Sequence, residues 1–160
     1  MVHVQPDQRY DPAAVVQVYV AAVNASDLAW ILAMYATDAV HVTLPAAEGS
    51  GGCLGKVQVR LFYQEGVANG DRIKVVDGTL EVVDNRVTFV ARLTSDPWRE
   101  LGLKALESNV KVVVRDGQFT THVVMLTPGS AWKLLTALGT IPAPLTGETS
   151  DRQDDLHAPL

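Results

Sequence analysis

The chain of 160 residues is 48% apolar and 19% charged, a balance that suits one globular domain with its own hydrophobic core. Its formal net charge of -5, with no basic stripe, argues against nucleic acid as a partner. Cys53 is the single cysteine, so no intramolecular disulfide can form and a reducing compartment is expected. The N-terminus lacks a signal-peptide pattern and no apolar run approaches the roughly 20 residues that span a bilayer. We therefore expect a soluble cytoplasmic protein without a membrane partner.

The first predicted element is a helix that begins after a flexible lead over residues 1–10. Asp11 can cap a helix, and Pro12 at the first helical position sacrifices no hydrogen bond. Helical spacing then places Tyr19 on an apolar face together with Val15, Val16 and Val23. This pattern predicts a helix that ends at about Asn24.

A second helix and a strand should follow. Ser26 and Asp27 form a helix-start signal, after which an apolar stripe recurs at i, i+3, i+4 and i+7: Leu28, Ile31, Leu32 and Tyr35. We expect this helix to end near Asp38. Residues 39–44 (AVHVTL) are short and β-branched, which predicts a strand bounded by Pro45.

The central part of the chain changes from helical to strand periodicity. Residues 56–67 are predicted to form a third helix with Val57, Leu61 and Phe62 facing the core. Residues 72–94 then alternate with a period of two and contain turn signals, which predicts two or three strands. Residues 95–105 interrupt this pattern.

The C-terminal part should contain a hairpin and a closing helix. The hairpin is expected to turn at Asp116 and Gly117, and the helix to cover residues 128–138. Residues 139–160 are polar and rich in proline, and we expect a disordered tail. Early helices and late strands predict an α+β fold over residues 11–138, in which a curved antiparallel sheet wraps around the N-terminal helices to form a cone with an internal pocket.

Two stretches, VVQVYVAAVNASDL (15–28) and MYATDAV (34–40), resemble the nuclear-transport-factor-like superfamily, particularly ketosteroid isomerases and SnoaL-like polyketide cyclases. The resemblance covers residues 11–138 and implies a cystatin-like α+β barrel. It also implies that Tyr19 donates a hydrogen bond to a substrate oxyanion, with Tyr35 and Tyr63 supporting it. A chain of buried phenols would strengthen the terminal donor. For each tyrosine the alternative is a purely structural hydroxyl.

The sequence departs from the isomerase pattern at the catalytic acids. The position of the carboxylate base holds Thr43 or, in another alignment, Leu44, and the second acid falls near Asn109 or Val110. Histidine can exchange protons near neutral pH, so His122 and then His41 are the candidates to replace these acids. If Thr43 faces the pocket, so does His41. The alternative places His41 on a polar outer face, in solvent or at a dimer contact.

Other residues carry less specific signals. Trp98 could form part of the pocket wall or simply pack, while Asp38 should close the second helix and Glu65 should face solvent. No third ligand has a convincing spacing with the two histidines, so no metal is expected, and no cofactor is implied.

The leading functional hypothesis is a cyclase or isomerase that folds an apolar polyketide-type intermediate, as in antibiotic biosynthesis, with help from Tyr19 and His122. An epoxide hydrolase or epoxide-opening cyclase is one alternative, but its Arg-x-Asp motif occurs only as Arg9-Tyr10-Asp11, before the first helix. A non-catalytic binding or dimerisation module is the other. Residues 86–94 are apolar on both faces, which predicts a homodimer.

Overall fold

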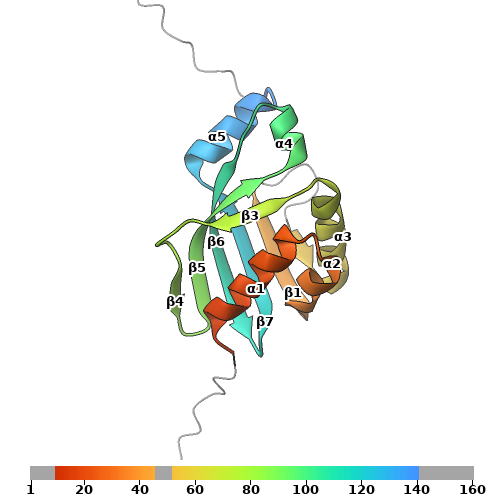
Figure 1. The fold of residues 1–160 in the computed structure, drawn as a ribbon, viewed down its shortest axis with the longest axis vertical. Coiled ribbons are helices and arrows are strands. Elements are labelled where there is room, and N and C mark those ends of the chain that lie inside the picture. The colour runs from red at the N-terminus through yellow and green to blue at the C-terminus, as the bar shows by residue number, and fades with distance from the viewer. Residues whose placement is uncertain (1–9, 46–51, 141–160) are drawn as a thin grey trace, which may run out of the picture.

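The computed structural model describes residues 10–45 and 52–140. The flexible lead expected before Asp11 and the tail expected after Leu138 lie almost entirely outside these residues. The described part confirms the expected α+β class. Helices α1 (Pro12–Asn24), α2 (Leu28–Ala33) and α3 (Gly55–Ala68) lie on one side of a curved sheet, while α4 (Asp96–Glu100) and α5 (Pro128–Ala137) lie at one end of it (Figure 1).

The sheet is open and contains both parallel and antiparallel pairs. Its hydrogen-bonded order is β2-β1-β7-β6-β5-β3, and β4 pairs with β5. Its strands are β1 (Tyr35–Leu44), β2 (Gly52–Leu54), β3 (Arg72–Val75), β4 (Glu81–Val83), β5 (Arg86–Thr94), β6 (Leu106–Arg115) and β7 (Gln118–Leu126). Strand β1 runs parallel to β7, whereas the other pairs are antiparallel. One pair in the expected antiparallel sheet is therefore parallel.

The first two helices begin where the sequence indicates, because aspartate side chains cap them. Asp11 accepts a hydrogen bond from the backbone N–H of Ala13 at 3.0 Å, and Asp27 accepts one from that of Trp30 at 3.0 Å. Helix α2 nevertheless ends at Ala33, five residues before the expected end at Asp38. The backbone N–H of Phe119 donates to the carbonyl of Met34 at 2.6 Å, so pairing with β7 extends the chain from this point.

Helix α3 buries a different face from the expected one. Its buried residues are Val59, Tyr63 and Gly66, which follow the spacing i, i+4 and i+7. Val57 is 76% exposed and Leu61 is 62% exposed, so their predicted core positions were wrong. The cause is the phase of the helix, because the face that holds Tyr63 and the small Gly66 packs against the core.

The long hairpin that completes the sheet turns where expected. Asp116 and Gly117 have φ angles of 50° and 75°, the conformation of the two-residue turns that match the twist of paired strands. Inward and outward side chains then alternate along β5 and β6, whereas on β7 the buried Phe119 and His122 are three residues apart, beside an irregularity in its pairing with β6. The core lies between this inner face and helices α1–α3, and the candidate site is part of it.

Candidate functional site

A cavity of about 600 Å³ opens between the inner face of the sheet and helices α1 and α3. Its walls include Tyr19 from α1, His41 and Thr43 from β1, Phe62 and Tyr63 from α3, and His122 from β7. Trp98 of α4 also lines it. The volume falls within the range of ligand-binding clefts, about 300–1,000 Å³.

Three tyrosines and one histidine form a continuous chain of buried hydrogen bonds, which we call the Tyr–His chain. The hydroxyls of Tyr19 and Tyr63 are 2.8 Å apart, and those of Tyr63 and Tyr35 are 2.6 Å apart. The Tyr35 hydroxyl lies 2.6 Å from Nδ1 of His122. Tyr19 and His122, at the two ends, both line the cavity, whereas Tyr35 does not line it and joins the chain from behind.

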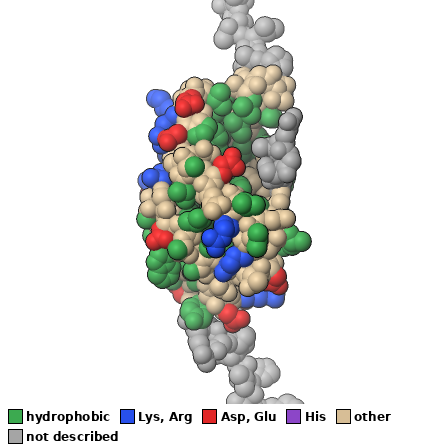
Figure 2. All heavy atoms as spheres, turned by 90° about the vertical axis from the view of Figure 1, so that its right-hand side faces the viewer, with side chains coloured by type: hydrophobic (Ala, Val, Ile, Leu, Met, Phe, Trp, Pro, Cys, Tyr) green, Lys and Arg blue, Asp and Glu red, His purple; other side chains and the backbone are tan. Residues whose placement is uncertain are grey.

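The pairing of β1 with β7 places the two histidines against each other. His41 and His122 are register partners, and their ring centroids are 4.7 Å apart with an angle of 21° between the planes. His41 is 2% exposed, so the alternative that placed it in solvent was wrong. The outward positions of β1 are instead apolar: Val40 is 37% exposed and Leu44 is 40% exposed. The space-filling view in Figure 2 accordingly shows no histidine on its face of the molecule.

Burial keeps the groups of this site uncharged near neutral pH. It raises the pKa of Tyr19 to about 12 and the pKa values of Tyr35 and Tyr63 well above their usual value. It lowers the pKa of His41 to about 4. Burial, with a smaller contribution from the charge of His41, holds the pKa of His122 well below its ordinary range. The site therefore offers neutral phenols and neutral imidazoles.

Two ring nitrogens of this site lack hydrogen-bond partners within the described part of the chain. They are Nε2 of His122 and Nδ1 of His41, both buried. Buried polar atoms are nearly always paired, since leaving one unpaired costs about 1–3 kcal/mol. Both histidines line the cavity, so a ligand there could supply a partner for these nitrogens.

Asp71 is a cavity residue that the sequence did not point to. It lies between α3 and β3, is half-buried and lines the cavity, with its Oδ1 atom buried and unpaired among the described residues. Burial raises the pKa of this carboxyl, and the charges of Glu65 and Asp96 add to the effect. Glu65 is exposed, as expected, but it also contributes to the cavity wall.

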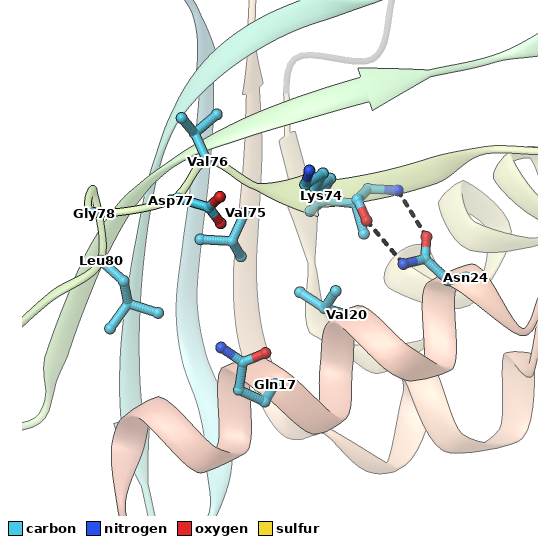
Figure 3. Close-up of a pocket in the computed structure, with 10 residues that line it drawn as sticks. Gln17, Val20, Asn24, Lys74, Val75, Val76, Asp77, Gly78 and Leu80 are labelled. Carbon is cyan, nitrogen blue, oxygen red and sulfur yellow. Dashed lines mark hydrogen bonds between the residues drawn. The ribbon is translucent and has the colours of Figure 1, made fainter.

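A second cavity of about 570 Å³ lies between α1 and the segment from β3 to Leu80 (Figure 3). The side-chain amide of Asn24 closes one end by bonding both backbone groups of Ile73, each at 2.8 Å. None of the tyrosines or histidines of the Tyr–His chain lines this cavity. The acid–base groups are therefore concentrated in the first cavity.

Residues 10–45 and 52–140 contain no group of three histidine, cysteine, aspartate or glutamate side chains placed to hold a metal ion. Within the same ranges, no helix is both long and apolar enough to cross a membrane.

Solved structures show which known fold the chain has. An NTF2-like protein of unknown function from Cytophaga hutchinsonii aligns with a TM-score of 0.59 at 10% identity, covering 79% of this chain and 99% of that one. A candidate ketosteroid isomerase from Kribbella flavida aligns with a TM-score of 0.58 at 18% identity, covering 72% of this chain and 77% of that one. A candidate polyketide cyclase from Xanthomonas campestris aligns with a TM-score of 0.55 at 23% identity, covering 77% of this chain and 94% of that one.

These likenesses establish an NTF2-like, cystatin-like fold, as the sequence resemblance implied. No protein-family model matches the chain, and no curated protein matches it in sequence.

Proposed function

We propose that this protein is an isomerase or cyclase for an apolar, carbonyl-containing small molecule of the polyketide-intermediate type. The observation that supports the proposal most is the Tyr–His chain, because its two ends line one cavity. A phenol at one end and an imidazole at the other are a suitable acid–base pair for moving a proton beside a carbonyl. Candidate isomerases and cyclases among the structures with this fold agree with the proposal.

In this proposal Tyr19 donates a hydrogen bond to the carbonyl or enolate oxygen of the substrate. His122 moves the proton through Nε2, the ring nitrogen that lacks a partner among the described residues. A neutral imidazole is required for this role, and burial together with His41 favours it. Tyr35 and Tyr63 orient the two ends, and Tyr35 acts only through its neighbours because it lies behind the cavity wall.

The rest of the cavity would bind the carbon skeleton. Phe62, Ile31 and Val110 contribute apolar surface, and Thr43 and Trp98 are further candidates for contact with the substrate. Holding a flexible chain in a reactive shape can by itself supply several kcal/mol of catalysis. Such positioning would add to the acid–base chemistry of Tyr19 and His122.

The first experiment measures exchange of deuterium from solvent into the C–H bonds beside the carbonyl of 1-tetralone, which serves as a model ketone. We expect the protein to accelerate this exchange, and Tyr19→Phe or His122→Ala to reduce the acceleration by about 100-fold or more. Tyr10→Phe is the matched control, since Tyr10 is 56% exposed and does not line the cavity. Binding of the ketone without exchange would favour a non-catalytic binding module instead.

Epoxide chemistry receives no comparable support. Of the triplet Arg9-Tyr10-Asp11, the structure describes the last two residues, and the carboxylate of Asp11 caps α1. A capping carboxylate before the first helix is not available to open an epoxide in the cavity. We also propose that the protein works in the reducing cytoplasm, on the basis of its single cysteine.

A further inference from the structure

We propose that the Tyr–His chain is a proton relay in which Tyr19 can donate to a substrate only when Nε2 of His122 is free to accept a proton. This inference rests on the function proposed above and adds to it a coupling between acid and base. It also names a substrate class: carbonyl compounds with a removable C–H near the carbonyl group.

The coupling follows from counting protons. Each phenol carries one proton and a neutral imidazole carries one, so the four side chains hold four. Their three hydrogen bonds occupy three of these protons. The fourth proton must lie at one end of the chain, either on the Tyr19 hydroxyl pointing away from Tyr63 or on Nε2 of His122.

The two arrangements have opposite chemical properties. In the first, Nδ1–H of His122 donates to Tyr35, Tyr35 to Tyr63 and Tyr63 to Tyr19, so Tyr19 can donate to a ligand and Nε2 is a base. In the second, every bond is reversed: Tyr19 donates to Tyr63 and Nε2–H is the free donor. An acceptor placed at Tyr19 therefore selects the basic form of Nε2, and the two ends are coupled through Tyr63, which lines the cavity, and Tyr35, which does not.

The relay allows a balanced proton transfer. A substrate C–H bond breaks and its proton passes to Nε2, while Nδ1 gives its proton to Tyr35, Tyr35 to Tyr63, Tyr63 to Tyr19 and Tyr19 to the substrate oxygen. The C–H electron pair forms a C=C bond and the carbonyl π pair takes the new O–H proton, so an enol results. No net charge remains on the protein, which suits a buried site because isolated charges are costly there.

The second half of the reaction restores the starting arrangement. The enol O–H returns its proton to Tyr19, the chain reverses, and Nε2–H protonates a different atom. That atom is a carbon in an isomerisation, or the new alkoxide oxygen when the enol carbon has attacked a second carbonyl in a ring closure. The ring centroids of Tyr19 and His122 are 5.4 Å apart, with an angle of 85° between the ring planes. Both ends of the relay can therefore contact one small substrate.

The test measures which nitrogen of His122 carries the proton, by nitrogen-15 NMR of labelled protein at neutral pH. The acceptor is benzophenone or 9-fluorenone, ketones that have no C–H beside the carbonyl. We expect saturation with either ketone to move the His122 proton to Nδ1. Tyr63→Phe should abolish this response, although Tyr19 and His122 at the two ends of the chain remain. Tyr35→Phe interrupts the chain at a second point and should have the same effect. Tyr10→Phe should respond like the wild type.

The outcomes separate the relay from the proposed function. A His122 proton that remains on Nε2 in the saturated wild type overturns the relay, even if 1-tetralone still exchanges its protons. A tautomer response in Tyr63→Phe equal to that of the wild type also overturns it. Failure of both ketones to bind counts against it as well, because the relay requires an acceptor site at Tyr19. A tautomer response without exchange of 1-tetralone supports the relay and removes the proposed catalysis.

Discussion

His41 and His122 face each other across the parallel pair of β1 and β7, with ring centroids 4.7 Å apart and planes inclined by only 21°. Stacked imidazoles so close together cannot both take up a proton without strong repulsion in a buried site. His41 thus helps to keep His122 neutral, and Tyr63 and Phe62 enclose His41 in turn, with ring centroids at 5.8 Å and 4.5 Å from it.

The first prediction concerns acid stability. The pKa of His41 falls from 6.5 to about 4 on folding, so the unfolded chain binds more protons between these values. The contribution of neutral His41 to the free energy of unfolding is therefore fully present above about pH 6.5 and is lost as the pH falls towards 4. A shift of this size corresponds to about 3 kcal/mol for His41 alone.

Urea unfolding at pH 7 and pH 4 checks this prediction in the wild type and in His41→Phe. The variant should lose about 3 kcal/mol less of its free energy of unfolding over this interval. An equal loss in both proteins would mean that His41 is not the buried neutral group described here.

The second prediction concerns the middle of the Tyr–His chain. Tyr35→Phe keeps the ring but removes the hydroxyl that joins Tyr63 to Nδ1 of His122, leaving a buried nitrogen unpaired. The free energy of unfolding at pH 7 should fall by about 1–3 kcal/mol. Chemical denaturation measures it, and Tyr10→Phe, at an exposed position, should stay within about 0.5 kcal/mol of the wild type. A loss in Tyr35→Phe no larger than in this control would contradict the hydrogen-bond chain.

The tyrosines of the chain were accessible from the sequence because local periodicity determines where they point. Tyr19 lies on a capped, amphipathic helix whose apolar face can be read directly. Tyr35 faces inward although it begins a strand instead of ending a helix, since that position is buried in either case. Tyr63 was placed by the family resemblance, and the helical pattern alone selected the wrong neighbours, Val57 and Leu61.

His41 and Asp71 show where sequence patterns stop being informative. Around His41, both faces of β1 carry apolar or weakly polar residues, so alternation could not tell which face is inner. The parallel pairing with β7, which decides this, depends on tertiary packing and not on the local pattern. Asp71 follows the turn after α3, where no periodicity applies. The position of Asp71 depends on close packing against Gly66, because a Cβ atom added to Gly66 would lie only 2.9 Å from Oδ2 of Asp71.

The third prediction tests the environment of Asp71. Its pKa is raised in the folded protein, so the folded state holds a proton over a range in which the unfolded chain has released it. The favourable contribution is complete below the unfolded pKa of 3.8 and disappears as the pH rises through the folded value. Asp71→Asn does not ionise and should escape this loss.

Melting temperatures of the wild type and Asp71→Asn at pH 3.5 and pH 7 measure the effect. The variant should gain stability relative to the wild type on going from the lower to the higher pH. Asp77→Asn, at an exposed position, serves as the control and should show no such relative gain. A relative loss in Asp71→Asn at pH 7 would show that the carboxylate has a partner, such as a nearby cation, that stabilises its charge.

The last prediction concerns the outer face of the sheet, for which we propose pairing with a second copy of the chain. Leu44 and Met125 are register neighbours on β1 and β7, and they are 40% and 47% exposed. Val42 and Val123, the register pair two positions earlier and so on the same face, continue the apolar surface. Apolar outward positions on adjacent strands are typical of a face that a partner covers.

Light scattering after size exclusion at micromolar concentration should give the mass of a dimer, twice 17.2 kDa. Met125→Lys places a charge at the centre of this surface and should shift the equilibrium towards monomer. Val83→Lys, at a position that is 54% exposed on the short strand β4, provides a matched control and should remain dimeric. A monomeric wild type, or equal masses for the two variants, would exclude this face as the interface. Because the cavity lies on the opposite face of the sheet, the Met125→Lys monomer should still bind benzophenone.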